Sequence, residues 1–192
     1  MQPILDRYLT RLTSLGERER QDILDELNIR KYARSTLLLE QGEVSGKCYF
    51  VLQGCLRQYA IDEQGREHTS NFYTEEQAVA GFSRYAPAEG SDCFVACVED
   101  CVVVVGDFAE EQAMFGRHGQ LESMARRMME EHLGKVQREF AAFAASSPEE
   151  RYRDMLRSRP DLPGRVPQHQ LASYLGMTPE SLSRIKKRLQ DA

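Results

Sequence analysis

The stretch Val166–Leu189 reads VPQHQLASYLGMTPESLSRIKKRL, and its pattern predicts two short helices with a tight turn between them. The apolar residues of the first helix are spaced to lie on one face, and they are Leu171, Ala172 and Leu175. Gly176 follows them, at a position where a residue without a Cβ ends a helix most easily. Thr178 can then cap a second helix through its hydroxyl, with Pro179 in the first helical position. Two helices joined in this way are typical of a helix-turn-helix.

The second helix combines an apolar face with a polar, basic face. Its inward-facing residues are expected to be Leu182, Ile185 and Leu189. Four cationic residues fall within five positions, and they are Arg184, Lys186, Lys187 and Arg188. Because such a face suits the phosphate backbone of DNA, we interpret the helix pair as a DNA-binding element. The alternative is that the two helices only pack against the rest of the chain.

The chain as a whole is acidic, whereas its C-terminal quarter is basic. The 192 residues include 25 Lys and Arg and 30 Asp and Glu, which gives a net charge of −5. From Pro148 onward there are nine Lys and Arg against six Asp and Glu. This distribution suits a protein that touches nucleic acid with one end.

No apolar run reaches the roughly 18 residues of a membrane span and no signal peptide is recognisable, so we expect a cytoplasmic protein without a membrane partner.

The preceding part of the chain changes from a helical to a strand-like pattern. Residues 2–27 carry helical apolar stripes with a break at Gly16. Short runs rich in β-branched, aromatic and leucine residues then alternate with turn signals, and these runs are Leu37–Glu40, Cys48–Leu52, Cys55–Ile61, Arg66–Tyr73, Cys93–Val98 and Val102–Val105. The third and fourth runs flank a glycine turn and are expected to form a hairpin. Short strands at this spacing predict a small antiparallel sandwich or barrel.

Helix returns at Phe108, and residues 120–145 are expected to form one long helix. Its apolar residues step by four and three, as in a coiled-coil heptad, and they are Met129, Leu133, Val136, Phe140 and Phe143. A helix packed on its own domain needs a similar stripe. A helix of this length would, however, overhang so small a sandwich, so we expect a parallel homodimer through this dimer interface.

A capping box marks the start of a further helix after this one. Ser147 can cap it, Pro148 takes the first position, and Glu150 can return a hydrogen bond from the third. We therefore place a hinge at residues 145–147. The predicted domains are a sensor domain with its long helix, 1–145, and a DNA-binding domain, 146–192.

The five cysteines do not form a recognisable metal or redox motif. No C-x-x-C pair is present, so we expect no metal site, and reduced thiols suit a cytoplasmic chain. Cys93, Cys97 and Cys101 are four residues apart and would share one face of a continuous strand. They could form an oxidation-sensing trio, although small buried core cysteines explain them more simply.

Taken in order, these parts resemble the cyclic-AMP receptor / fumarate–nitrate regulator (Crp/Fnr) superfamily of bacterial transcription regulators. The resemblance is carried by LLLEQGE at 37–43, YFVLQG at 49–54 with Leu56 and Arg57, DEQGRE at 62–67, VEDC at 98–101, and Gln170–Leu189. It implies an α+β fold: a cyclic-nucleotide-binding-type β-roll (a double-stranded β-helix or jelly roll), a long dimerisation helix, and a C-terminal helix-turn-helix. This last part would be winged-helix-like with the wing absent or truncated, because only three residues follow Leu189.

The resemblance also implies which side chains face DNA. The family's base-reading positions fall on Pro179, Glu180 and Arg184; arginine can pair with guanine and glutamate with cytosine, whereas Pro179 replaces the arginine often found there. The residues expected to position the backbone through phosphate, or to add positive charge, are Gln168, His169, Ser173, Thr178, Ser181, Ser183, Lys186 and Lys187.

The expected effector pocket departs from the family pattern. Its candidate residues are Gly81, Phe82, Ser83, Arg84, Ser91 and Asp92. Phe82 stands where members that bind cyclic nucleotides have glutamate, and Ser91-Asp92 stands where an arginine would hold the cyclic phosphate. An aspartate repels phosphate, so we do not expect cyclic AMP in the usual mode. We expect no iron–sulfur cluster either, since no cysteine precedes Leu37, and the effector stays unknown.

The sequence therefore predicts a homodimeric, sequence-specific transcription regulator that binds a palindromic site in double-stranded DNA. RNA polymerase is a possible further partner, and no set of residues suggests an enzyme. Two alternatives stay open. The β-roll could be a ligand- or protein-binding module without a DNA function, or the chain could be a thiol-based redox sensor regulator.

Overall fold

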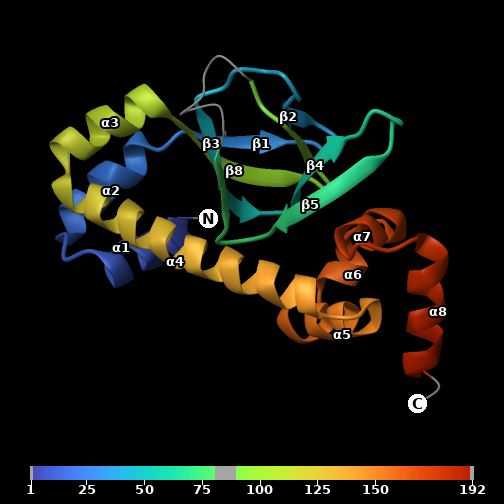
Figure 1. Ribbon diagram of the computed structural model, residues 1–192. Helices are drawn as coiled ribbons and strands as arrows, with labels where there is room; N and C mark the ends of the chain where they lie inside the picture. Colours follow the sequence, from blue (N-terminus) through green and yellow to red (C-terminus); the bar gives the residue numbers. More distant parts are fainter. Residues whose placement is uncertain (1, 81–89, 191–192) are drawn as a thin grey trace.

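The computed structural model of the chain describes residues 2–80 and 90–190. The strands are β1 (Ile29–Tyr32), β2 (Leu37–Leu39), β3 (Lys47–Gln53), β4 (Leu56–Ile61), β5 (Glu67–Tyr73), β6 (Ala78–Ala80), β7 (Phe94–Cys97) and β8 (Cys101–Asp107). The helices are α1 (Gln2–Leu12), α2 (Glu17–Glu26), α3 (Phe108–Arg117), α4 (Gly119–Ala145), α5 (Pro148–Ser158), α6 (Leu162–Arg165), α7 (Gln168–Tyr174) and α8 (Pro179–Gln190). The strands form a roll in the middle of the chain, with helices on both sides in sequence (Figure 1).

The roll consists of two four-stranded antiparallel sheets. One has the order β1-β8-β3-β6 and the other β2-β7-β4-β5. Consecutive strands β4 and β5 form the expected hairpin, whereas β7 and β8 belong to different sheets. The predicted antiparallel β-roll is thus confirmed. The sequence pattern did not predict β1 and β6, because β1 is short and half charged and β6 has only three residues.

The core of the roll lies between the inner faces of the two sheets. Val51 and Val103 of the first sheet and Leu56 and Val95 of the second are essentially inaccessible to water. Along β7, the buried Val95 and Cys97 alternate with the more exposed Phe94 and Ala96, as the period of two requires when one face of a strand is buried. The roll is therefore held by the apolar stripes that the sequence predicted.

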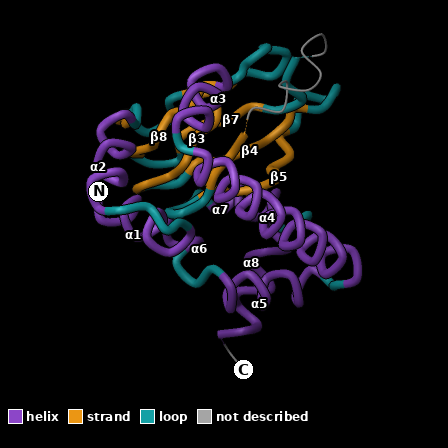
Figure 2. The backbone as a smooth tube through the Cα atoms, turned by 90° about the vertical axis from the view of Figure 1, so that its left-hand side faces the viewer, coloured by secondary structure: helices purple, strands orange, loops and turns teal. Residues whose placement is uncertain are grey.

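Helix α4 begins in a helical cluster beside the roll and ends at the C-terminal helices (Figure 1). Near its start Leu121 is buried against α1 and α2, and Gln120 accepts hydrogen bonds from Ser14. In both ribbon and tube views α4 then runs from α3 to α5 (Figure 1 and Figure 2). From Met129 to Ala145 nearly all of its side chains are exposed. The predicted overhang of the long helix is therefore present.

The C-terminal helices begin with the capping box that the sequence predicted. Ser147 Oγ accepts from the Glu150 N–H, and the Ser147 N–H donates to the Glu150 carboxylate. The core of helices α5–α8 also includes side chains of the roll, namely Cys55, Phe72 and Val98. The expected division at residues 145–147 falls at the end of α4, yet apolar packing continues across it. The division into domains 1–145 and 146–192 stays a prediction.

Within the described residues, no helix is both long enough and apolar enough to cross a lipid bilayer.

Gly54, at the turn between β3 and β4, is expected to tolerate no side chain. Its φ is +104°, and a Cβ there would lie 2.7 Å from the Asp100 carbonyl oxygen and 2.7 Å from Cys101 Sγ. We expect Gly54→Ala to reduce the free energy of unfolding by about 3 kcal/mol through backbone strain and overpacking.

The matched control is Gly65→Ala. This turn also has a positive φ, +76°, but nothing lies within 4 Å of the added Cβ. We expect a loss of about 1 kcal/mol from the left-handed conformation alone. Urea denaturation of both variants measures the difference, and equal losses would contradict the close approach at Gly54.

Candidate nucleic-acid interface

Helices α7 and α8 form a helix-turn-helix around Gly176. This glycine has a φ of +66°, and a Cβ there would lie 3.0 Å from Phe143 Cζ. Leu171 and Ala172 of α7 and Leu182 of α8 are fully buried against one another and their neighbours. The turn therefore depends on a residue without a side chain for two reasons, a left-handed backbone and a close neighbour.

The N-terminus of α8 is capped as the sequence predicted. Thr178 Oγ1 accepts from the Ser181 N–H at 3.3 Å. Glu180 lies in the first turn, where its own backbone N–H, the Thr178 hydroxyl and Arg184 hold the pKa of its carboxyl below the usual range. It is thus ionised at neutral pH and can accept hydrogen bonds from a ligand. Arg184 donates to Ser181 Oγ at 3.3 Å, which aligns it along the same side of α8.

Most of the predicted DNA-facing residues are exposed on this element. The exposed ones are Gln168, His169, Thr178, Pro179, Glu180, Ser183, Arg184 and Lys187; Ser181 and Lys186 are half-buried. The structure therefore brings the predicted residues of α8 and the start of α7 to the surface.

Ser173 differs from the rest of the set. Its hydroxyl accepts from the Thr69 N–H at 2.9 Å and donates to the Glu67 carbonyl oxygen at 3.0 Å. Both partners belong to β5, an edge strand of its sheet. Ser173 therefore binds the roll in this structure, and we leave it out of the proposed interface.

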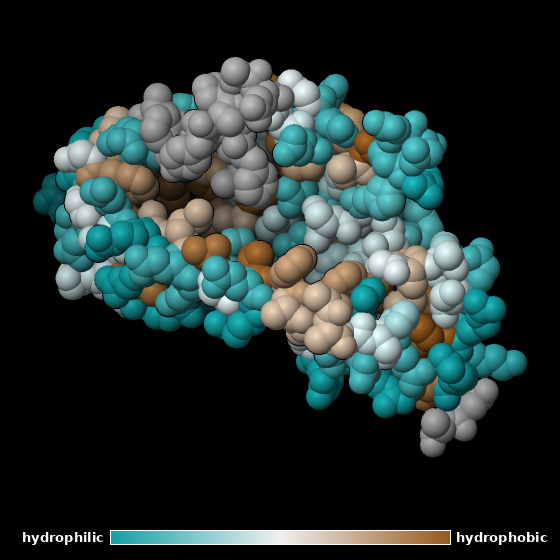
Figure 3. Space-filling view, viewed as in Figure 1, coloured by the Kyte–Doolittle hydropathy of each residue, from teal (hydrophilic) through white to brown (hydrophobic). Residues whose placement is uncertain are grey.

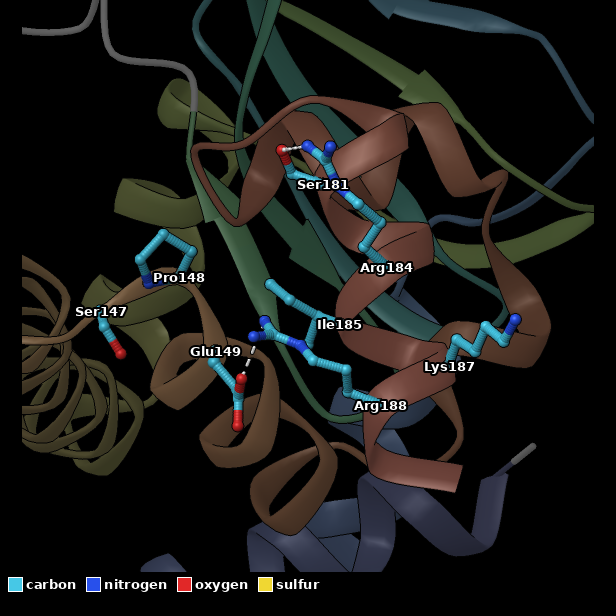
Figure 4. A pocket seen from close by; sticks show the side chains of 8 residues that line it. All are labelled: Ser147, Pro148, Glu149, Ser181, Arg184, Ile185, Lys187 and Arg188. Carbon is cyan, nitrogen blue, oxygen red and sulfur yellow. Dashed lines mark hydrogen bonds and ion pairs between the residues drawn. The ribbon is translucent and has the colours of Figure 1, made fainter. Parts of the chain in front are cut away.

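A groove of about 760 Å³ lies between the start of α5 and one side of α8. Its lining includes Ser147, Pro148, Glu149, Arg184 and Lys187. Figure 4 shows Arg188 reaching across to Glu149, with a nitrogen–oxygen distance of 3.0 Å, while Lys187 extends away from α5. Of the three cations that line the groove, Arg188 therefore pairs with the Glu149 carboxylate, whereas Arg184 and Lys187 do not.

Arg151 joins three elements at the base of the helix-turn-helix, and sequence reasoning missed it. Its Nη1 donates to the Leu175 carbonyl oxygen, and its Nε to those of Phe143 and Ser146, at 3.1–3.2 Å. Its guanidinium also lies 3.8 Å from the centre of the Phe143 ring. No spacing in the sequence marks it, because its partners are backbone carbonyl oxygens, which a residue of any type supplies.

The apolar stripe predicted on α4 is exposed along its whole length. Its side chains are Met129, Leu133, Val136, Phe140 and Phe143, and Phe140 is 73% accessible. In the space-filling view, brown and tan surface lies over the C-terminal half of α4 between hydrophilic patches (Figure 3). A single chain does not bury this face, contrary to the alternative that α4 packs on its own domain.

Only two residues of the expected effector pocket can be placed. Gly81, Phe82, Ser83 and Arg84 lie outside the described residues. Ser91 is buried, and its hydroxyl donates to the Cys93 carbonyl oxygen at 2.8 Å. Asp92, in contrast, is exposed. The Ser91 hydroxyl is thus already used by the backbone next to it.

The cysteines of β7 and β8 are buried and do not share one continuous strand. Cys101 Sγ donates to the Glu99 carbonyl oxygen at 3.2 Å, and the neighbouring Cys101 thiol together with burial raises the pKa of Cys97. Burial raises the pKa of Cys55 to about 12. Among the described residues, no three His, Cys, Asp or Glu side chains are grouped so as to hold a metal ion. Burial agrees with the core interpretation of these cysteines.

Comparison with known proteins agrees with this architecture. Residues 29–118 match the family model of the cyclic nucleotide-binding domain. The fold is similar to that of FixK2 from Bradyrhizobium japonicum, with a TM-score of 0.72 and 17% identity over 86% of this chain and 85% of that one. It is also similar to the c-di-GMP responsive global regulator CLP of Xanthomonas campestris, with a TM-score of 0.67 and 18% identity over 89% and 90% of the two chains.

A mutant of CooA from Carboxydothermus hydrogenoformans gives a TM-score of 0.67 and 14% identity over 94% of this chain and 87% of that one. No curated protein sequence matches the chain. Because these structures are only distantly related in sequence, the likeness concerns the fold. At that level it confirms the predicted fold, with its order of roll, long helix and helix-turn-helix.

We expect cyclic AMP at millimolar concentration to leave the melting temperature unchanged. Ser91 is engaged with the backbone of Cys93, and the exposed Asp92 would repel the cyclic phosphate. Thermal denaturation with and without the nucleotide measures this, with 5′-AMP as the control for general nucleotide effects. A rise in melting temperature specific to cyclic AMP would contradict the prediction.

Proposed function

We propose that this protein is a homodimeric transcription regulator of the Crp/Fnr kind that binds a palindromic DNA site through α8. The observation that carries the proposal is the exposed face of α8, on which Arg184 and Lys187 stand beside the ionised Glu180. Such a face can satisfy both phosphates and base edges in the major groove. The proposed role includes no catalytic activity, and the proposed location is the cytoplasm.

Arg184 and Glu180 are the proposed base-reading residues. Arg184 can donate two hydrogen bonds to guanine O6 and N7, and Glu180 can accept one from cytosine N4. Pro179 can make only apolar contacts. The phosphate-contacting residues would be Gln168, His169, Thr178, Ser181, Ser183, Lys186 and Lys187, which surround the base-reading pair.

A second copy of the chain is the proposed partner of the α4 stripe. Five large apolar side chains in heptad spacing match the contact surface of a parallel two-stranded coiled coil. Dimerisation would present two copies of α8, so that each could enter one of two successive major grooves, about 34 Å apart. This symmetry is the reason for proposing a palindromic site.

The β-roll would sense a small effector of unidentified chemistry, with RNA polymerase as a possible downstream partner. The cyclic nucleotide-binding domain match to residues 29–118 supports a ligand-binding ancestry for the roll. The effector would act by changing the relative position of the two α8 helices.

Two substitutions on α8 separate base reading from phosphate contact. We expect Arg184→Ala to cost about 1–3 kcal/mol on a duplex selected from a random-sequence library, and to relax one base position. Lys187→Ala should instead weaken binding to all sequences about equally and lower the salt slope by about one. Fluorescence anisotropy over a range of salt concentrations measures both effects.

Arg157→Ala serves as the control, since Arg157 is exposed on α5 and pairs with Asp154 of its own helix. A base-selective loss for Lys187→Ala would refute the assignment of roles. Wild-type protein that fails to bind DNA even at low salt would favour the alternative of a binding module without a DNA function.

Val136→Glu tests the dimer interface. Two glutamates facing each other across the α4 seam repel and are poorly hydrated, so we expect monomers in sedimentation velocity. Ala142→Glu places the same charge on the exposed opposite side of α4 and should leave the dimer intact. An unchanged sedimentation profile for Val136→Glu would rule out this seam.

A further inference from the structure

We propose that Arg165 is a positioning residue: by bridging two turns of the β-roll, it holds α8 in the orientation that a palindromic site requires. The inference rests on the proposed function and adds a residue that is not among the proposed DNA contacts. Arg165 lies on α6, the single helical turn between α5 and α7. Its guanidinium meets Glu75 and Glu99 of the roll, so Arg165 lies on the side of the C-terminal unit (α5–α8) that faces the roll.

Arg165 makes ion pairs with two carboxylates from separate parts of the roll. Its Nη1 and Nη2 each donate to one oxygen of Glu75 at 2.8 Å, in a bidentate pair. Its Nε donates to Glu99 Oε1 at 3.0 Å. Glu75 follows β5, and Glu99 lies between β7 and β8. Because the guanidinium is planar and held on two sides, it fixes the orientation of the C-terminal unit relative to the roll as well as its distance from the roll.

The Glu75 carboxylate is itself held firmly by the roll. It accepts the Gly54 N–H at 2.8 Å. The next residue, Glu76, has a φ of +67°; it pairs with Arg7, and its carbonyl oxygen accepts the Tyr8 hydroxyl. Contacts from α1 and from β3–β4 thus fix the turn that carries Glu75. The bridge joins the C-terminal unit to a rigid part of the molecule.

Further contacts along β5 support the same docked position. Arg159 donates to the Phe72 carbonyl oxygen, and Ser173 bonds to the backbone of Glu67 and Thr69. The rings of Phe72 and Tyr174 meet edge to face at 5.4 Å. These contacts hold the C-terminal unit along β5. The ion pairs of Arg165 add two further points of attachment, at the turns that carry Glu75 and Glu99.

Orientation matters because two recognition helices must bind at once. If the C-terminal unit moved freely after Ser146, binding to the second half-site would require ordering that unit again. A docked unit has already lost this freedom, so the second contact is made at a high effective concentration. Loss of the bridge should therefore weaken binding to a full palindrome while binding to one half-site stays nearly the same.

The decisive variant is the double substitution Glu75→Gln and Glu99→Gln. It removes two negative charges, which by itself would strengthen DNA binding. The amide oxygen that replaces the Glu75 carboxylate can still accept the hydrogen bond from the Gly54 N–H. We expect about tenfold weaker binding to the palindrome, less than twofold change on a single half-site, and a smaller penalty for a half-turn insertion between half-sites. Arg165→Lys, which keeps the charge but not the bidentate geometry, should lie between wild type and the double variant.

Arg157→Gln is the matched control, because it removes a cation from the same unit without touching the roll. Hydrogen exchange at the Thr69 amide, which is bonded to Ser173, measures docking without DNA. Faster exchange in a double variant that is still folded and dimeric is expected. Unchanged exchange in the double variant would overturn the inference. So would an unchanged affinity of the double variant for the palindrome, provided that the wild type binds DNA. If the wild type binds no DNA but exchange at the Thr69 amide is faster in the double variant, the proposed function fails. The bridge is then a docking contact only.

Discussion

The C-terminal helices share their apolar core with the β-roll, and the position of α8 depends on this shared core. Phe72 and Cys55 of the roll are fully buried among side chains that include Leu162, Leu171 and Leu182. A helical unit of this size rarely buries enough apolar surface alone to be stable. The roll therefore supplies part of its folding energy, and it determines where α8 points.

A second connection runs from α4 to the turn of the helix-turn-helix. Phe143 is the last residue of the exposed stripe, and it lies against Arg151 and close to Gly176. Arg151 in turn donates to the carbonyl oxygen of Leu175, just before that turn. In the proposed dimer, a change in the spacing of the two α4 helices would thus reach α8 through direct contacts. Helix α8 is linked to the proposed dimer seam on one side and to the roll on the other.

Much of the candidate site follows from local sequence, because local contacts create it. Thr178 caps α8, Gly176 takes a left-handed backbone, and Ser147 and Glu150 form a capping box, each through residues a few positions apart. Ser173 shows the limit of such reasoning. It looks like a phosphate-contacting residue in the sequence, but its hydroxyl is taken by β5, more than a hundred residues away. Nothing in the spacing around Ser173 indicates that partner.

The sequence alone determined the order of roll, long helix and helix-turn-helix, the apolar stripe of α4 and the basic face of α8. Those features arise from periodicity, caps and turns, which act over a few residues. Only the tertiary structure decided that β7 and β8 lie in different sheets and that α7 docks on β5. It alone also brought Arg165 between Glu75 and Glu99. These pairings join residues far apart in the chain, where hydrogen-bonding geometry and shape complementarity select partners that no local pattern encodes.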